Sequence, residues 1–290
     1  MPPRYVSVAI LVFWAFAAVG LATRDILPEW IVGLPPDFQS ISRAADSQGP
    51  SRWLVQVVDK PGDDDLRSVG QASTESIRRG DGGLELRSRI WFDSSELLRG
   101  TSIEAAVGVR LSAESSFQVD PSGNLKSFLL IVRASNDPEP VMTVEGRQSG
   151  GKIEVVSRGA LPLLTWKRTL EYAPRGLVQD GLGPIDRLPG LHLGQRWETR
   201  VVSPITGRVE TARVEVARKR VIHWGTSPVT TFEVLQKLGP LTSRAWVRPD
   251  GLVLRQEIPF PLVKLVLERQ AAPVDVSPND PANSPQGVRP

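Results

Sequence analysis

An uninterrupted apolar run opens the chain. Residues 5–22 are eighteen consecutive positions without a charge, most of them Val, Ala, Leu or aromatic residues. A helix of about 17–25 such residues crosses the hydrocarbon core of a bilayer, where it satisfies its own backbone hydrogen bonds. Arg4 precedes the run and the charges after it are mixed, so the positive-inside bias favours a cytoplasmic N-terminus. The pattern predicts a cytoplasmic tail at 1–4 and a transmembrane helix at 5–22.

Two other interpretations of this run stay open. A cleaved signal peptide also has a basic start and an apolar middle, and the small residues here would fit cleavage after Ala17 or Ala22. The run is longer than the usual apolar region of about 7–15 residues in a signal peptide, which favours a retained anchor. A buried core helix is the third interpretation, and the lack of a polar face argues against it. We therefore expect an inner-membrane, single-pass protein whose bulk is extracytoplasmic.

The rest of the chain is dominated by alternation. Residues 23–50 show little periodicity and indicate a stalk, and 271–290 hold five prolines with almost no large apolar residue, which is typical of a disordered tail. Between them, apolar and polar residues alternate with a period of two, as in half-buried strands. The strand candidates are 52–58, 69–79, 84–91, 115–119, 125–133, 141–148, 152–158, 165–172, 197–202, 208–216, 229–237, 243–247, 252–258 and 264–269.

Residues typical of turns and helix caps lie between these predicted strands. The sequences at 120–123, 149–151 and 248–251 are rich in Asp, Pro, Ser and Gly and predict hairpin turns. Asp93 and the residues after it could cap a short helix that runs into Leu98. The stretch 174–194 is rich in Gly and Pro and is interpreted as a long loop, or as a crossing between two halves of the sheet. We expect a mainly β domain over 51–270: a curved antiparallel meander, half-barrel or incomplete barrel, with one or two short helices.

The composition of the chain excludes several classes of function. The 35 basic and 32 acidic residues leave a net charge of +3, too small a field to hold nucleic acid. The chain has no cysteine, which excludes disulfides, thiolate metal sites and cysteine nucleophiles. It also lacks a Gly-x-Ser-x-Gly elbow, a phosphate loop and a dinucleotide fingerprint. We therefore expect a protein that is not an enzyme and has no cofactor; an envelope hydrolase that uses Asp or Glu is an alternative, because such carboxylates can be distant in sequence.

Three features could carry chemistry, and each also has a plain structural interpretation. His192 and His223 lack the spacing of a metal pair and are taken as ordinary surface histidines. Residues 63–65 are three aspartates that lack the spaced ligands of a calcium loop, which favours a solvated turn. Residues 218–220 are three cations at a strand end; they could meet an anionic surface, but a solvent-facing turn is the favoured interpretation. No catalytic or metal-binding residue is assigned.

Three stretches together carry a resemblance. They are 24–28 after the apolar run, 193–197 leading into 203–208, and 245–257. They resemble a bacterial family of single-pass, exported β domains of unknown function, some of which precede a transglutaminase-like domain. More distantly, the hairpin rhythm is similar to the curved sheets of lipoprotein carriers and related lipid-binding domains. The shared residues are turn and packing residues, so the resemblance implies a fold and no catalytic site; without cysteine, a transglutaminase-like Cys-His-Asp site is impossible.

The apolar C-terminal strands offer a candidate binding surface. If the half-barrel is open, its concave side could accept an acyl chain or an apolar peptide. The expected function is a non-enzymatic, membrane-tethered cell-envelope domain that binds or scaffolds a lipid, a lipoprotein or a protein partner. The alternative is a purely structural interaction module with a filled core. The candidate ligand face consists of Leu235, Trp246, Leu252, Leu254, Ile258, Leu265 and Leu267.

Overall fold

The computed structural model describes residues 36, 49–58, 66–97, 109–134, 139–172, 184–203, 208–260 and 263–271. The tail and anchor expected at 1–22, nearly all of the stalk, the aspartates at 63–65 and the C-terminal tail after Ala271 lie outside these residues. Within the described ranges, no helix combines the length and the apolar character needed to cross a membrane.

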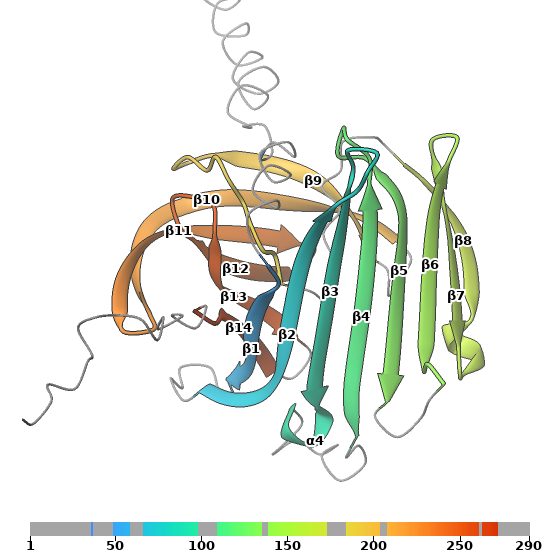
Figure 1. Ribbon diagram of the computed structural model, residues 1–290, viewed down its shortest axis with the longest axis horizontal. Coiled ribbons are helices and arrows are strands. Elements are labelled where there is room, and N and C mark those ends of the chain that lie inside the picture. Colours follow the sequence, from blue (N-terminus) through green and yellow to red (C-terminus); the bar gives the residue numbers. More distant parts are fainter. Residues whose placement is uncertain are drawn as a thin grey trace, which may run out of the picture.

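Fourteen strands form one antiparallel sheet (Figure 1). Strands β1 to β8 follow one another across one half, β9 to β14 do so across the other half, and β1 pairs with β14 where the halves join. The consecutive strands β8 and β9 form the two edges, so the sheet is not closed. The expected mainly β, antiparallel, incomplete meander is confirmed. The strands are β1 (Ser51–Val58), β2 (Leu66–Arg78), β3 (Leu84–Asp93), β4 (Arg110–Val119), β5 (Leu125–Ala134), β6 (Met142–Ser149), β7 (Lys152–Gly159), β8 (Trp166–Glu171), β9 (Arg196–Ser203), β10 (Arg208–Trp224), β11 (Ser227–Leu238), β12 (Leu241–Val247), β13 (Val253–Phe260) and β14 (Val263–Arg269).

Helical structure in the described chain is limited to two short elements, α4 (Ser94–Leu97) and the 3-10 turn η3 (Pro162–Leu164). The start of α4 follows from its cap: Asp93 Oδ1 accepts hydrogen bonds from the backbone N–H of Ser95 at 3.0 Å and from its hydroxyl at 2.6 Å. An Asp side chain satisfies backbone donors that the first turn of a helix leaves unpaired. The expected capped helix is therefore present between β3 and β4.

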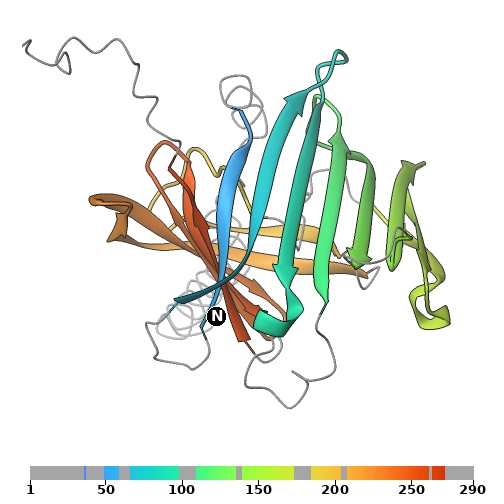
Figure 2. The ribbon, with the colours of Figure 1, turned by 60° about the horizontal axis from the view of Figure 1, so that its bottom comes forward.

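The two halves of the sheet pack against each other. Figure 2 shows the long strands of the second half running across those of the first. Alternate residues of each strand point into the space between the halves, as β4 illustrates with buried and partly exposed residues in turn. Their apolar side chains form one cluster that includes Trp53 and Val55 from β1, Phe117 from β4 and Val216 from β10. We call the side of the sheet that faces this cluster the inner face, and the opposite side the outer face.

A crossing segment, residues 184–195, lies on the inner face. Its hydrogen bonds with β13 and the preceding turn join Leu188 N–H to Gly251 O at 2.8 Å and Val253 N–H to Asp186 O at 3.2 Å. Gly251 has a φ of +86°, and a Cβ there would lie 2.6 Å from Pro189 Cα, so this close approach requires glycine. The predicted crossing between the halves is thus present from residue 184 onward; residues 173–183 lie outside the described chain.

The turn expected at residues 218–220 is wrong. These three cations lie inside β10, which continues to Trp224 and pairs with β11. A register shift between Val216 and Arg218 absorbs the change in the apolar alternation and lets the pairing continue. The chain instead turns at Gly225, which has a φ of +59°.

Candidate functional site

The predicted ligand face does not lie on one side of the sheet. Leu265 and Leu267 pair with Val57 and Val55 of β1, and directly opposite residues share a face, so both lie on the inner face. Ile258 pairs with Leu265 and lies there too. Leu235 and Trp246 occupy the outer face, opposite Arg244 and Arg255 respectively.

The inner members of the predicted face are packed as core. Leu267 is 1% exposed and belongs to the apolar cluster, and Ile258 and Leu265 pack against it. Leu252 forms an isolated bridge with Arg187 of the crossing segment, and Leu254 is fully buried beside the register shift of β13. The structure therefore brings three of the seven residues together on the inner face, where Leu267 is buried and Ile258 and Leu265 are partly buried. That they hold a ligand stays a prediction.

A buried polar cluster holds the crossing segment to the sheet. Arg269 Nη1 donates to Asp186 Oδ1 at 2.7 Å, and the guanidinium lies 5.2 Å from the centre of the Trp53 ring. Trp53 Nε1 donates to Thr74 Oγ1 at 3.1 Å, and that hydroxyl donates to the same Asp186 oxygen at 3.4 Å. Arg269 also donates to the Ser51 hydroxyl. The charges of Arg269 and Asp186 compensate each other within the cluster, so removing either one would leave the other charge uncompensated.

Sequence reasoning missed this cluster. Asp186 lies in the Gly/Pro-rich stretch and Arg269 ends the last strand, 83 residues later. The signal that could have found the pair is an arginine at a strand position whose neighbours on the same face, Leu267 and Leu265, are apolar. Such a position predicts a buried cation, which needs a carboxylate partner.

The two histidines are placed as ordinary surface residues. His192 and His223 are both exposed, and the backbone N–H of His192 donates to Gln195 Oε1 at 3.0 Å. Across the described ranges, no three His, Asp or Glu side chains gather closely enough to hold a metal ion.

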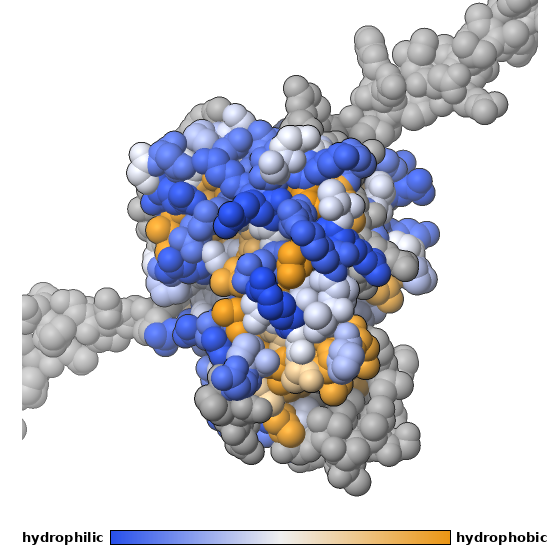
Figure 3. Space-filling view, turned by 90° about the vertical axis from the view of Figure 1, so that its right-hand side faces the viewer, coloured by the Kyte–Doolittle hydropathy of each residue, from blue (hydrophilic) through white to orange (hydrophobic). Residues whose placement is uncertain are grey.

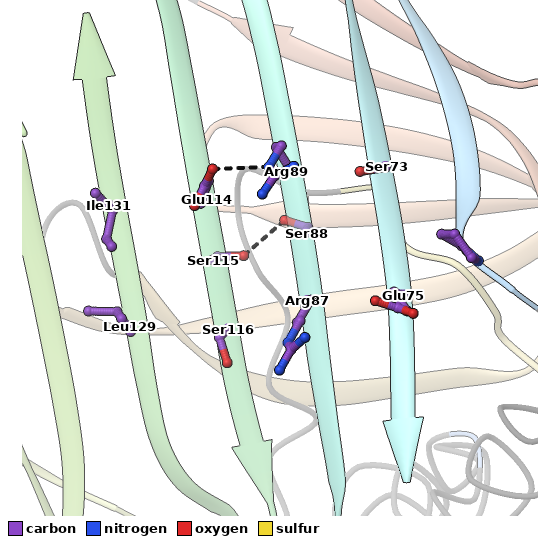
Figure 4. A pocket seen from close by; sticks show the side chains of 11 residues that line it. Ser73, Glu75, Arg87, Ser88, Arg89, Glu114, Ser115, Ser116, Leu129 and Ile131 are labelled. Carbon is purple, nitrogen blue, oxygen red and sulfur yellow. Dashed lines mark hydrogen bonds and ion pairs between the residues drawn. The ribbon is translucent and has the colours of Figure 1, made fainter. Parts of the chain in front are cut away.

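The outer face of β2–β7 is hollowed. Two adjoining hollows, of about 360 and 640 Å³, share Ser116 and Leu129 in their walls. We call them together the outer trough. Figure 4 shows the first hollow: Arg89 and Glu114 are joined by an ion pair between neighbouring strands, and Leu129 and Ile131 lie on the next strand, β5. None of the seven predicted face residues lines either hollow.

The hollow shape follows from the sizes of the side chains. Ser73, Ser116 and Ser127 line the hollows with small side chains, which leave open space between the longer residues around them. Long charged pairs flank them: Arg89 Nε is 3.0 Å from Glu114 Oε1, and Arg87 holds Glu85 through two hydrogen bonds of 2.8 and 3.0 Å. Leu129, 36% exposed, is an apolar surface between these charges.

The rim of the outer trough carries acidic and basic side chains. The hydrogen bond from Arg87 lowers the pKa of Glu85, and a hydrogen bond from the Ser116 hydroxyl at 2.8 Å lowers it further. Arg147, by contrast, is an exposed cation of the second hollow for which the described residues provide no ion-pair partner. Such a surface can align donors and acceptors with a polar backbone, but it holds no nucleophile paired with a base.

The fold defines a class: mainly β proteins built from one open antiparallel meander. No protein-family model and no curated protein matches the sequence. The chain is similar to the crystal structure of a β-barrel-like protein of the domain of unknown function DUF1849 from Brucella abortus, with 12% identity and a TM-score of 0.50, covering 82% of this chain and 97% of that one. A DUF1089 family protein from Pseudomonas aeruginosa matches with 15% identity and a TM-score of 0.34, covering 65% of this chain and 89% of that one. The likeness to the DUF1849 structure supports the fold. The expected membrane anchor and the link to transglutaminase-like proteins stay predictions.

Proposed function

We propose that this chain is a non-enzymatic interaction module of the cell envelope that binds an extended segment of a protein partner in the outer trough. Residues 5–22 hold it at the inner membrane with its bulk outside the cytoplasm, as the apolar run predicts. One observation carries the proposal: both described hollows lie on the outer face, whereas side chains from both halves of the sheet occupy the inner face.

The dimensions of the outer trough suit an extended chain. It runs from β2 to β7, and neighbouring strands lie about 4.8 Å apart, which gives a length of about 24 Å. An extended segment rises about 3.3 Å per residue, so about seven residues fill that length.

The lining favours a peptide over an acyl chain. Serine hydroxyls and ionised side chains can exchange hydrogen bonds with the backbone of a peptide, whereas an acyl chain gains free energy only from apolar surface. Leu129 offers one apolar contact in the centre, and Arg147 offers a cation for an acidic group. The expected segment therefore carries an apolar residue near its middle and an acidic residue that meets Arg147.

Site-specific photo-crosslinking of the full-length protein in its own cells tests the proposal. A photoreactive amino acid at Leu129 should form an adduct with one discrete envelope protein, and one at Ser112, on the outer face of β4 but outside the trough, should not. Ser116→Trp, which fills the trough, should abolish the adduct from Leu129. The matched variant Ser112→Trp should preserve it. Adducts only with phospholipid, or equal adducts from both positions, would contradict a protein-binding trough.

A further inference from the structure

Among the described strands, β8 forms an edge of the sheet, and this edge has features that the proposed function does not use. Figure 1 shows β8 as the last strand of the first half, with β7 on one side of it. The strand is short, from Trp166 to Glu171. An unpaired edge leaves backbone N–H and C=O groups that another strand can bind.

The pairing with β7 shows which of those groups are free. Tyr172 N–H donates to Gly151 O at 3.0 Å, and these two residues continue the register in which Lys152 lies opposite Glu171. In an antiparallel pair, hydrogen-bonded and non-hydrogen-bonded positions alternate. Trp166, Arg168 and Leu170 therefore direct their backbone groups to β7, and the N–H and C=O groups of Lys167, Thr169 and Glu171 point to the free edge.

The side chains at these three free positions are complementary to themselves. Lys167, Thr169 and Glu171 are all exposed, and they lie on the outer face because they pair with Val156, Glu154 and Lys152. If two copies of β8 run antiparallel about Thr169, then Lys167 of each copy lies directly opposite Glu171 of the other. All three positions become hydrogen-bonded pairs in that register. Opposite charges in such cross-strand pairs stabilise a sheet, and like charges destabilise it.

The charges at the edge can be exchanged at little cost. Lys167 is paired with Glu154, and Glu171 lies 3.6 Å from Lys152, but the side chain of Glu171 is 82% exposed. Ion pairs exposed to this degree contribute little to stability, so new partners can replace them.

The surface at this end of the sheet is mostly hydrophilic. Figure 3 faces it: hydrophilic side chains cover the upper part, and apolar ones gather below, at the height of η3 in Figure 1.

We propose that a second copy of this chain pairs with β8, forming a two-fold symmetric dimer centred on Thr169. The contact is isologous, because each strand presents the same residues to the other. It joins the two sheets into one and places the two outer troughs on the same side. The contact and the peptide site use different groups: the dimer uses backbone groups at the edge, and the trough lies on the face. They meet at Glu154, which lines the second hollow and pairs with Lys167.

A single cysteine can report this contact, because the chain has none of its own. In an antiparallel hydrogen-bonded pair the Cα atoms lie about 5.5 Å apart, within the range that a disulfide spans. Full-length Thr169→Cys protein in its native membrane should form a disulfide dimer on mild oxidation. The matched variant Thr143→Cys, on the same face of β6 but inside the sheet, should give at least about fivefold less dimer. Equal yields from the two positions, or disulfides from the Thr169→Cys thiol to a different protein, would overturn the proposal.

Charge reversal then separates pairing from folding. In the Thr169→Cys background, Lys167→Glu places carboxylates opposite each other, and Glu171→Lys places ammonium groups opposite each other. Each variant alone should therefore lose most of its dimer. When the two variants carry different tags and are made together, the carboxylates of one chain meet the ammonium groups of the other, and the mixed dimer should return to within about twofold of the parent yield. A misfolded edge could not be rescued by a partner chain, so failure of the mixed dimer to form would refute the register.

Discussion

The buried polar cluster around Arg269 and the outer trough contain the same kinds of residues in opposite surroundings. Arg269 on the inner face is 7% exposed and pairs with Asp186 of the crossing segment. On the outer face the side chain of Arg89 is 65% exposed and pairs with Glu114 of the next strand. The first ion pair joins segments that are far apart in the chain, whereas the second only borders a hollow. Burial therefore decides which of these side chains hold the fold and which are available to a partner.

Removal of an inner tryptophan should have the largest effect. Trp53 is fully buried, so Trp53→Ala should lower the free energy of unfolding by about 3–5 kcal/mol through the cavity that it leaves. Trp91→Ala is the matched variant on the outer face of β3, where the ring is partly exposed beneath Arg110. It should cost no more than about 1.5 kcal/mol, because less apolar surface is lost from burial. Urea denaturation measures both, and equal losses would contradict the assignment of the two faces.

Loss of the buried cation should come next. Arg269→Met leaves the Asp186 carboxylate without its main partner and should cost about 3 kcal/mol. Arg89→Met removes an exposed pair and should cost less than about 1 kcal/mol. Adding Asp186→Asn to Arg269→Met should recover part of the loss, because the uncompensated charge is then gone. If the double variant loses more free energy of unfolding than the two single variants lose together, Arg269 and Asp186 do not act as a pair.

The Tyr172 hydroxyl should matter to an intermediate degree. It accepts a hydrogen bond of 2.7 Å from the backbone N–H of Leu125, a residue that is 1% exposed. Tyr172→Phe leaves that donor unpaired and should cost about 1–2 kcal/mol. Hydrogen exchange at the Leu125 amide should accelerate in the variant, and an unchanged exchange rate would show that the hydroxyl is dispensable.

The smallest expected effect lies at the rim of the outer trough and depends on pH. The hydrogen bond from Arg87 lowers the pKa of Glu85 in the folded protein. The contribution of ionised Glu85 to the free energy of unfolding is therefore fully present above the unfolded-state pKa of about 4.3. It is lost as the pH falls through the lower pKa of the folded state. Because Arg87 is 53% exposed, Glu85→Gln should cost less than about 1 kcal/mol at pH 7 and less still near pH 2. Thermal unfolding at both pH values measures the difference, and a larger loss in acid would reverse the sign of this argument.

The sequence predicted the strands well because their alternation is local. The strand candidate at 125–133 corresponds to β5, and the Asp-Pro-Ser-Gly turn before it forms through Asp120, whose carboxylate accepts the backbone N–H groups of Ser122 and Asn124 at 2.9 and 2.8 Å. The predicted strand at 208–216 is shorter than β10, because the alternation of apolar and polar residues breaks at the register shift. Pairing with β11 nevertheless continues through that shift. The local sequence predicts turns, because turn residues act within a few positions of each other. It does not predict a bulge that depends on pairing with another strand.

The candidate site was less accessible to sequence reasoning. Leu235 and Leu265 both look like core residues along the chain, yet the pairing register puts them on opposite faces. A one-residue difference in phase reverses the face of a side chain, and phase depends on pairing between distant strands. The outer trough arises because Ser116 of β4 and Ser127 of β5 are small side chains on one face of neighbouring strands. No single segment of the sequence contains that arrangement.

A pair of substitutions that enlarge side chains tests most directly whether the inner face is filled and the outer face is hollow. Val144 is fully buried on the inner face of β6, and Ser116 lines the outer trough on β4. Val144→Phe should lower the free energy of unfolding by about 1–3 kcal/mol, because a packed core cannot accept a larger ring without strain. Ser116→Phe should change it by no more than about 0.5 kcal/mol, because the ring enters open space. A Val144→Phe protein as stable as the parent would reveal room between the two halves and contradict the filled inner face.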